Sequence, residues 1–141
     1  MIKRTKSRVK KMAIIIIIVI VLVFAIAQTA MIIDTQRFMR YAHGVFDGSI
    51  NQDNRTERTG ELWIYMGYAN NIPNNAEYSY SLHRFLTWHN FQQGFIYVTY
   101  NQRYHDKDTG KYVWGIGEQR IWYIEKVDGE WQLVGMNPIR A

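Results

Sequence analysis

Glu118 and Arg120 form the pair of charges whose types and spacing best suit a binding site. They occupy alternate positions of a predicted strand over residues 111–127, so both side chains lie on one face of a sheet. Strand alternation adds an apolar set to that face: Tyr112, Trp114, Ile116, Trp122 and Ile124. A carboxylate among aromatic rings can serve as a general base, and an arginine there can bind an anion. The candidate ligand-binding residues are Trp114, Glu118, Arg120 and Trp122.

The same two residues also have an interpretation that needs no ligand. Glu118 and Arg120 then pair at a solvated rim of the sheet, or a bulge at the nearby glycines turns them outward. The rest of the chain has no nucleophile elbow, glycine-rich phosphate loop or zinc motif. No catalytic residue and no cofactor are predicted, and binding is favoured over catalysis.

Two histidines, His83 and His89, are six positions apart and would share one face of a regular strand. Imidazole is a common zinc ligand, but no third ligand accompanies this pair. Residues 105–108 have ligand-type side chains, which a solvated turn also requires. The sequence therefore predicts no metal site.

Aromatic residues are concentrated after residue 33, where 20 of the 21 occur. Contiguous exposed aromatic rings mark interaction surfaces, whereas small sheets also use such rings in their cores. The candidate interface residues are Tyr97, Tyr100, Tyr104 and Tyr123. Both interpretations apply equally to these four tyrosines.

The elements that would position these side chains follow from the changing period of the apolar residues. Residues 34–50 have the spacing of an amphipathic helix. From residue 78 the period becomes two, with strands predicted over 78–90, 95–104, 111–127 (or a bulged pair) and 130–136. Asp128-Gly129 is a two-residue hairpin turn, and Gly115 and Gly117 permit sharp bending. The predicted fold class is α+β: helices, then a curved antiparallel sheet of about four strands.

Between these helices and strands, residues 51–60 and 70–77 are loops by composition, and periodicity does not decide between helix and strand for residues 61–69.

Residues 13–33 form an uncharged run of 21 residues, long enough for a transmembrane helix. Six cations and no acid precede the run, so the N-terminus should stay in the cytoplasm and residues 34–141 outside. Ala25-Ile26-Ala27 resembles a signal-peptide cleavage site, but apolar residues resume at 30–33, which favours an uncleaved anchor. The predicted organisation is a basic tail (1–12), a single span (13–33) and an extracytoplasmic domain (34–141).

The net charge of +5 comes from the tail, because residues 34–141 carry 11 cations and 12 acids. A domain without net positive charge is not suited to binding nucleic acid. The predicted location is the cell membrane, with the membrane, other envelope proteins or a second copy of the chain as partners. The absence of cysteine means that packing alone must hold the domain together.

The segment from Phe95 to Pro138 resembles the C-terminal half of nuclear transport factor 2-like domains. The resemblance lies in an apolar strand, an Asp-Gly turn and a Trp-containing strand, here residues 121–134. It implies a curved sheet wrapped around helices, with a pocket that is shallow or absent because residues 61–77 are short for the family's further helices. The layout of tail, span and outer domain is similar to assembly subunits of type IV secretion and conjugation machines.

These observations predict a membrane-anchored interaction or scaffold domain of a bacterial envelope assembly, such as a conjugation or secretion apparatus. The alternative is a pocket protein of the nuclear transport factor 2-like class, which binds a small ligand or acts as an enzyme.

Overall fold

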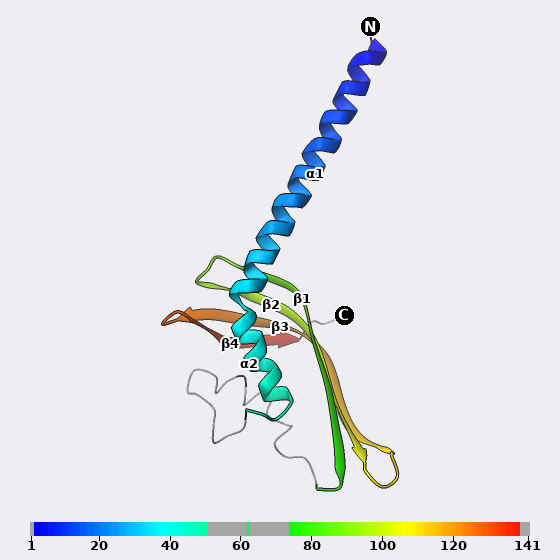
Figure 1. Cartoon of the computed structure of the whole chain (residues 1–141), viewed down its shortest axis with the longest axis vertical. Helices are drawn as coiled ribbons and strands as arrows, with labels where there is room; N and C mark the ends of the chain where they lie inside the picture. Colours follow the sequence, from blue (N-terminus) through cyan, green and yellow to red (C-terminus); the bar gives the residue numbers. More distant parts are fainter. Residues whose placement is uncertain (1, 51–61, 63–73, 139–141) are drawn as a thin grey trace.

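A computed structural model of the chain describes residues 2–50, 62 and 74–138, and it places a long helix on one side of a bent sheet (Figure 1). The elements run from α1 (Ile2–Asp34) and α2 (Gln36–Phe46) to β1 (Ala76–His89), β2 (Gln93–Asp106), β3 (Tyr112–Val127) and β4 (Glu130–Pro138). The four strands form one antiparallel sheet in the order β1-β2-β3-β4. The predicted α+β class, with helices followed by a sheet of four strands, is confirmed.

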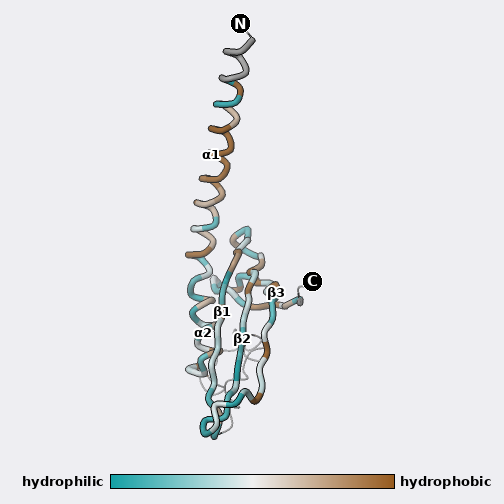
Figure 2. Tube along the Cα trace, turned by 90° about the vertical axis from the view of Figure 1, so that its right-hand side faces the viewer, coloured by the Kyte–Doolittle hydropathy of each residue, from teal (hydrophilic) through white to brown (hydrophobic). Residues whose placement is uncertain are grey.

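The helix α1 contains a stretch, Arg8–Asp34, that is long and apolar enough to cross a membrane. Its apolar side chains are exposed from Val9 to Ile26, and Figure 2 shows this region in brown above the sheet. The helix continues without interruption through Ala25–Ala27 to Asp34. A helix with this exposed apolar surface needs a covering, which a bilayer supplies.

The predicted amphipathic helix is present as α2, which ends at Phe46, earlier than expected. Its buried face consists of Phe38, Met39, Ala42, Gly44, Val45 and Phe46. Only Thr35 separates α2 from α1, and its hydroxyl donates a hydrogen bond to the Met31 carbonyl at 2.8 Å. Gly48, with φ of 78°, turns the chain after the helix.

The turns and strand ends follow the sequence closely. Asp128 and Gly129 have φ of 50° and 83°, which confirms the predicted hairpin turn with positive φ at both positions. The 111–127 region is one strand, β3, starting at Tyr112. Ala76 and Glu77 begin β1 instead of ending the predicted loop 70–77. The expectations for 51–60 and 61–69 lie outside the described residues, except that Leu62 is buried.

The sheet bends across the middle of β1, β2 and β3, as Figure 1 shows, and α2 lies in the bend. A Cβ on Gly115 would lie 2.5 Å from the Gln102 carbonyl oxygen, so the close approach of β2 and β3 requires glycine there. The core lies between α2 and the concave face of the sheet, here called the inner face. Its largest members include Phe38, Phe46, Ile96, Trp122 and Ile124.

Candidate functional site

The four candidate ligand-binding residues lie on the inner face of β3. Trp114, Glu118, Arg120 and Trp122 pair in register with inner-face residues of β2, namely Tyr104, Tyr100, Val98 and Ile96. Their surroundings differ along the strand. Trp122 is fully buried, with its ring edge-on to Phe38 at 6.1 Å, while Trp114 is 46% exposed and packs on Tyr104. The two tryptophans therefore stand at opposite ends of the strand face and do not close around one cavity.

Glu118 is the centre of a compact polar cluster between these tryptophans. Its Oε2 accepts a hydrogen bond from the Tyr100 hydroxyl at 2.7 Å and from Arg120 Nε at 2.5 Å. Arg120 Nη2 also lies 2.5 Å from the same oxygen, and about a quarter of each charged side chain is exposed. The Arg120 guanidinium and the Tyr100 phenol thus share one carboxylate oxygen.

The cluster changes the proton affinities of its members. Burial of Tyr100, together with its hydrogen bond to the Glu118 carboxylate, raises the pKa of the phenol well above its usual value. Burial opposes the charge on Arg120, but the hydrogen bonds and charge of Glu118 raise its pKa overall. The arrangement suits an ion pair on a half-buried sheet face, as in the ligand-free interpretation of these residues.

Tyr112 lies on the opposite face from Trp114, contrary to strand alternation. The register of β2 and β3 shifts between Tyr104 and His105, and Tyr112 then packs edge-on against the His105 ring. A bulge adds one residue to one strand and so reverses the face of everything beyond it. The predicted common face therefore loses its first member.

The four candidate interface tyrosines divide between the two faces. Tyr100 and Tyr104 are in the core, with 4% and 7% of their surface exposed. Tyr97 and Tyr123 lie on the convex side, here called the outer face, where Tyr97 donates a hydrogen bond to Gln119 at 3.0 Å. The four tyrosines therefore cannot belong to one surface.

The outer face carries an apolar cluster that extends across all four strands. Trp88, Phe95, Tyr123 and Gly135 stand opposite one another, as do Leu86, Tyr97 and Ile121 in the next row. We call this cluster the outer patch: Phe85, Leu86, Trp88, Phe95, Tyr97, Ile121, Tyr123 and Val134. Phe85, Trp88 and Val134 are 66%, 49% and 49% exposed. Sequence reasoning found only Tyr97 and Tyr123. Trp88, Phe95 and Ile121 alternate with buried residues, whereas the adjacent Phe85 and Leu86 stand at the bulge in β1, which strand alternation does not predict.

His83 and His89 are on opposite faces, so the expectation that they share one is wrong. The register of β1 and β2 shifts between Arg84 and Leu86, which moves the second histidine to the inner side. His83 is exposed and His89 is buried. No group of three or more potential metal ligands occurs among the described residues.

The buried His89 belongs to the joint between α1 and the sheet. The Asp34 carboxylate accepts hydrogen bonds from Trp131 Nε1 at 2.9 Å and Lys126 Nζ at 3.1 Å. His89 Nε2 lies 3.4 Å from the Met31 carbonyl oxygen. Sequence reasoning missed this joint because its partners are far apart in the chain. Lys126 and Trp131 lie 92 and 97 residues after Asp34, and His89 lies 58 residues after Met31.

Arg84 makes a second set of contacts at this joint. Its guanidinium donates to the Ile32 carbonyl at 3.3 Å, to the Thr35 hydroxyl at 3.1 Å and to Gln36 Oε1 at 3.2 Å. Burial lowers the pKa of Arg84 from its usual value. An arginine that satisfies a carbonyl at the end of α1 and the first residue of α2 fixes both helices to β1.

A long apolar helix joined firmly to an open α+β sheet defines a membrane-anchored domain. The comparison of solved structures finds the intermembrane-space region of the chloroplast protein ARC6, with 12% sequence identity and a TM-score of 0.45. The match covers 82% of this chain and 97% of that one. No protein-family model matches the chain, and no curated protein sequence does.

Proposed function

We propose that this protein is a membrane-tethered interaction domain, held at the bilayer by α1 and binding another envelope protein or a second copy of itself. The anchor supports this proposal because it is long enough for a span and rigidly attached to the sheet. Confinement to a membrane raises the effective concentration of the domain for neighbouring subunits. We propose a conjugation or secretion apparatus as the setting of this protein. We also propose that its outer domain has a nuclear transport factor 2-like fold.

The observation that carries the binding role is the edge of β3 that faces away from β2 and that no described strand covers. The strand β4 pairs only with Arg120–Val127, so no described strand covers the Tyr112–Gln119 side away from β2. Tyr112 and Val113 are each 61% exposed on this stretch, and Trp114 is 46% exposed. An exposed strand edge with large side chains on both faces suits the addition of a strand from a partner.

A photo-crosslinking residue at Val113 tests this role in the full chain within native membranes. We expect a discrete crosslinked product, either a dimer or an adduct of one defined mass. Val127 is the matched control, because it is an exposed valine of the same strand but is paired with β4. Equal crosslinking at both valines, or none at Val113, would argue against this edge of β3 as the binding surface.

The topology we propose has residues 1–12 inside, 13–33 in the membrane and 34–141 outside. The chain has no cysteine, so Ser7→Cys and Asp128→Cys each introduce one thiol. In intact cells an impermeant maleimide should label the cysteine at position 128 and reach position 7 only after permeabilisation. The reverse pattern contradicts the proposed orientation, and loss of the tail from the mature chain contradicts an uncleaved anchor.

A further inference from the structure

The contacts between α1 and β1 set the height of the sheet relative to the anchor. The Thr87 amide donates to Gln28 Oε1 at 3.5 Å, and Arg84 reaches the Ile32 carbonyl at 3.3 Å. His89 stands beside the Met31 carbonyl at 3.4 Å. The second half of β1 therefore lies alongside residues 28–32, near the C-terminal end of the apolar run.

This height coincides with the surface of a bilayer crossed by α1. A hydrocarbon core of about 30 Å takes about 20 helical residues, so the proposed span over residues 13–33 fills it and ends at Ile33. Gln28 is five residues before that limit, which corresponds to about 7–8 Å along the helix. Amphipathic helices that lie in the interface bury their apolar faces about 5–10 Å into the headgroup and acyl boundary, and we take this depth as the scale for an aromatic sheet face.

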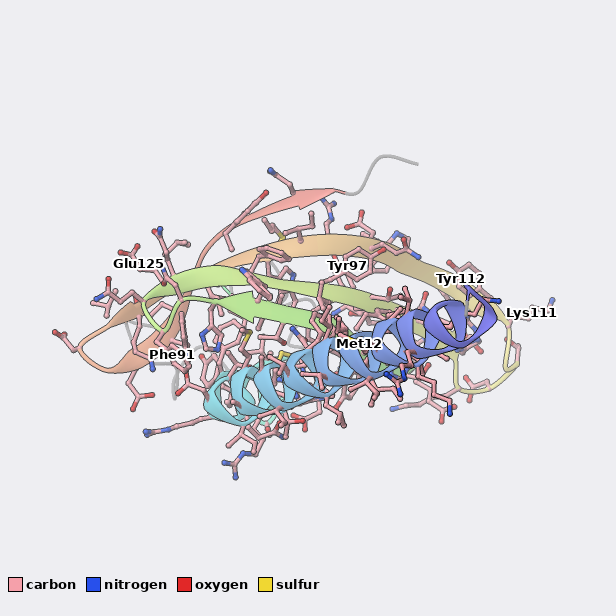
Figure 3. The ribbon with its side chains drawn as sticks, turned by 90° about the horizontal axis from the view of Figure 1, so that it is seen from above. Met12, Phe91, Tyr97, Lys111, Tyr112 and Glu125 are labelled. Carbon is pink, nitrogen blue, oxygen red and sulfur yellow. The ribbon has the colours of Figure 1, made fainter. Side chains whose placement is uncertain are left out.

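The outer patch belongs to the part of the sheet that is seen from the side of the N-terminus in Figure 3, where Tyr97 of the patch is labelled. In Figure 1 the β1–β2 hairpin is the part of the sheet closest to the apolar half of α1. Figure 3 views the molecule from above, on the side of the N-terminus, and the ribbons of β1, β2 and β3 present their broad faces to the viewer. Phe91 is labelled at the hairpin end beside the last turns of α1.

We propose that the outer patch and the β1–β2 hairpin tip dock on the surface of the same bilayer that α1 crosses. The partner is the lipid headgroup interface, where tryptophan, tyrosine and phenylalanine are enriched. Trp88 and Phe91 enter deepest, because they flank the hairpin tip beside α1. The inference rests on the proposed span and goes beyond it, since it assigns a lipid-facing side to the domain.

The composition of the hairpin fits a lipid surface. Residues 78–105 contain two arginines, three histidines and no acidic residue, so nothing on β1 or β2 over this range repels anionic headgroups. The polar residues of the turn, Asn90, Gln92 and Gln93, are exposed and can hydrogen-bond to headgroups. Glu125 of β3 pairs with Gln93 beside the hairpin turn and borders the outer patch, so the docking relies on the aromatic rings rather than on attraction to anionic headgroups.

Phe91 adds an independent observation. It has φ of 69° and is 57% exposed, so a bulky side chain occupies a left-handed position that glycine would fill without strain. Among the described ring contacts, the Phe91 ring makes one, which is an edge-on contact with the His89 ring at a centroid distance of 5.0 Å. A ring held at a conformational cost and pointed outward is explained if the ring enters an apolar phase.

Spin labels on the full chain in nanodiscs test the docking directly. Because the natural chain has no cysteine, Trp88→Cys, Phe91→Cys and Val113→Cys each provide one labelling site on an exposed residue. The discs contain phosphatidylcholine and phosphatidylglycerol, at one chain per disc. We expect the nitroxides at 88 and 91 to collide with oxygen several-fold more, and with a water-soluble nickel complex several-fold less, than the nitroxide at 113.

Equal nickel accessibility at positions 91 and 113 would overturn the docking. Protection that appears only in discs with two chains would also overturn it, in favour of an interface between copies of the chain. A chain that fails to enter discs would instead refute the proposed span, so the two failures are distinguishable. Near-UV circular dichroism of each labelled variant confirms that the core tryptophans keep their native packing.

Discussion

Asp106 organises the turn between β2 and β3 through one carboxylate oxygen. Its Oδ1 accepts hydrogen bonds from the Asp108 amide at 3.1 Å, the Thr109 amide at 2.8 Å and the Thr109 hydroxyl at 2.9 Å. The two bonds from Thr109 are the main reason that the pKa of Asp106 lies below its usual value. Since the folded pKa is the lower one, Asp106 stabilises the fold above its unfolded pKa of about 3.9. That contribution is lost as the pH falls through the folded pKa.

Thr109→Val should move the pKa of Asp106 upward, toward its usual value, because the hydroxyl donor is removed while the shape is kept. A carbon-detected NMR titration of the carboxyl group measures the shift. Thr99→Val, on the outer face of β2 and outside the turn, serves as the control and should leave the Asp106 titration unchanged. An unchanged pKa in Thr109→Val would mean that the backbone amides alone hold the carboxylate.

Asp34 is the residue on which the joint between anchor and sheet converges. Asp34→Ala removes the acceptor for Trp131 Nε1 and Lys126 Nζ, and leaves both donors partly buried. We expect a loss of about 1–3 kcal/mol in the free energy of unfolding, with a smaller loss for Asp34→Asn, which keeps an oxygen acceptor. Urea unfolding of the full chain in detergent micelles provides the measurement, with Glu125→Ala as the surface control. If Asp34→Ala and Asp34→Asn lose the same free energy of unfolding, the stabilisation comes from the charge of Asp34 rather than from its hydrogen bonds.

At the scale of the elements, the bend of the sheet depends on the contact between β2 and β3 at Gly115. A methyl group there would meet a backbone oxygen 2.5 Å away, and a backbone atom cannot move aside as a side chain does. Gly115→Ala should therefore destabilise the domain by about 1–3 kcal/mol, the usual cost of overpacking. Gly135→Ala is the matched control, since its methyl group would meet Tyr123 at an ordinary 3.9 Å. Similar unfolding midpoints for both variants would contradict the role assigned to Gly115.

The same elements show why the fold was predictable and the faces were not. Alternation and the Asp128-Gly129 turn specify β2, β3 and β4, because side-chain period and turn dihedrals are local properties. The bulges after Arg84 and near Val113 reverse the faces of His89 and Tyr112, and a single added residue leaves no mark on composition. The pairing of Glu118 with Arg120 follows from their spacing on one strand. The Asp34–Trp131 contact depends on tertiary packing across most of the chain.

At the scale of the whole molecule, the length of α1 and its attachment to the sheet set the depth of the outer patch relative to the bilayer. Inserting four leucines between Val19 and Ile20 lengthens the span by about 6 Å and by about one helical turn, so the domain keeps nearly the same rotation. The patch should then rise out of the headgroup region, and a nitroxide at position 91 should become accessible to the water-soluble nickel complex. As a control, replacing Ile15–Ile18 by four leucines introduces the same number of leucines without changing the length of the span. The label at position 91 should stay protected in this control. If the insertion leaves the label as protected as the control does, the depth of the hairpin is not set by α1, and the docking would have to be held by the patch alone.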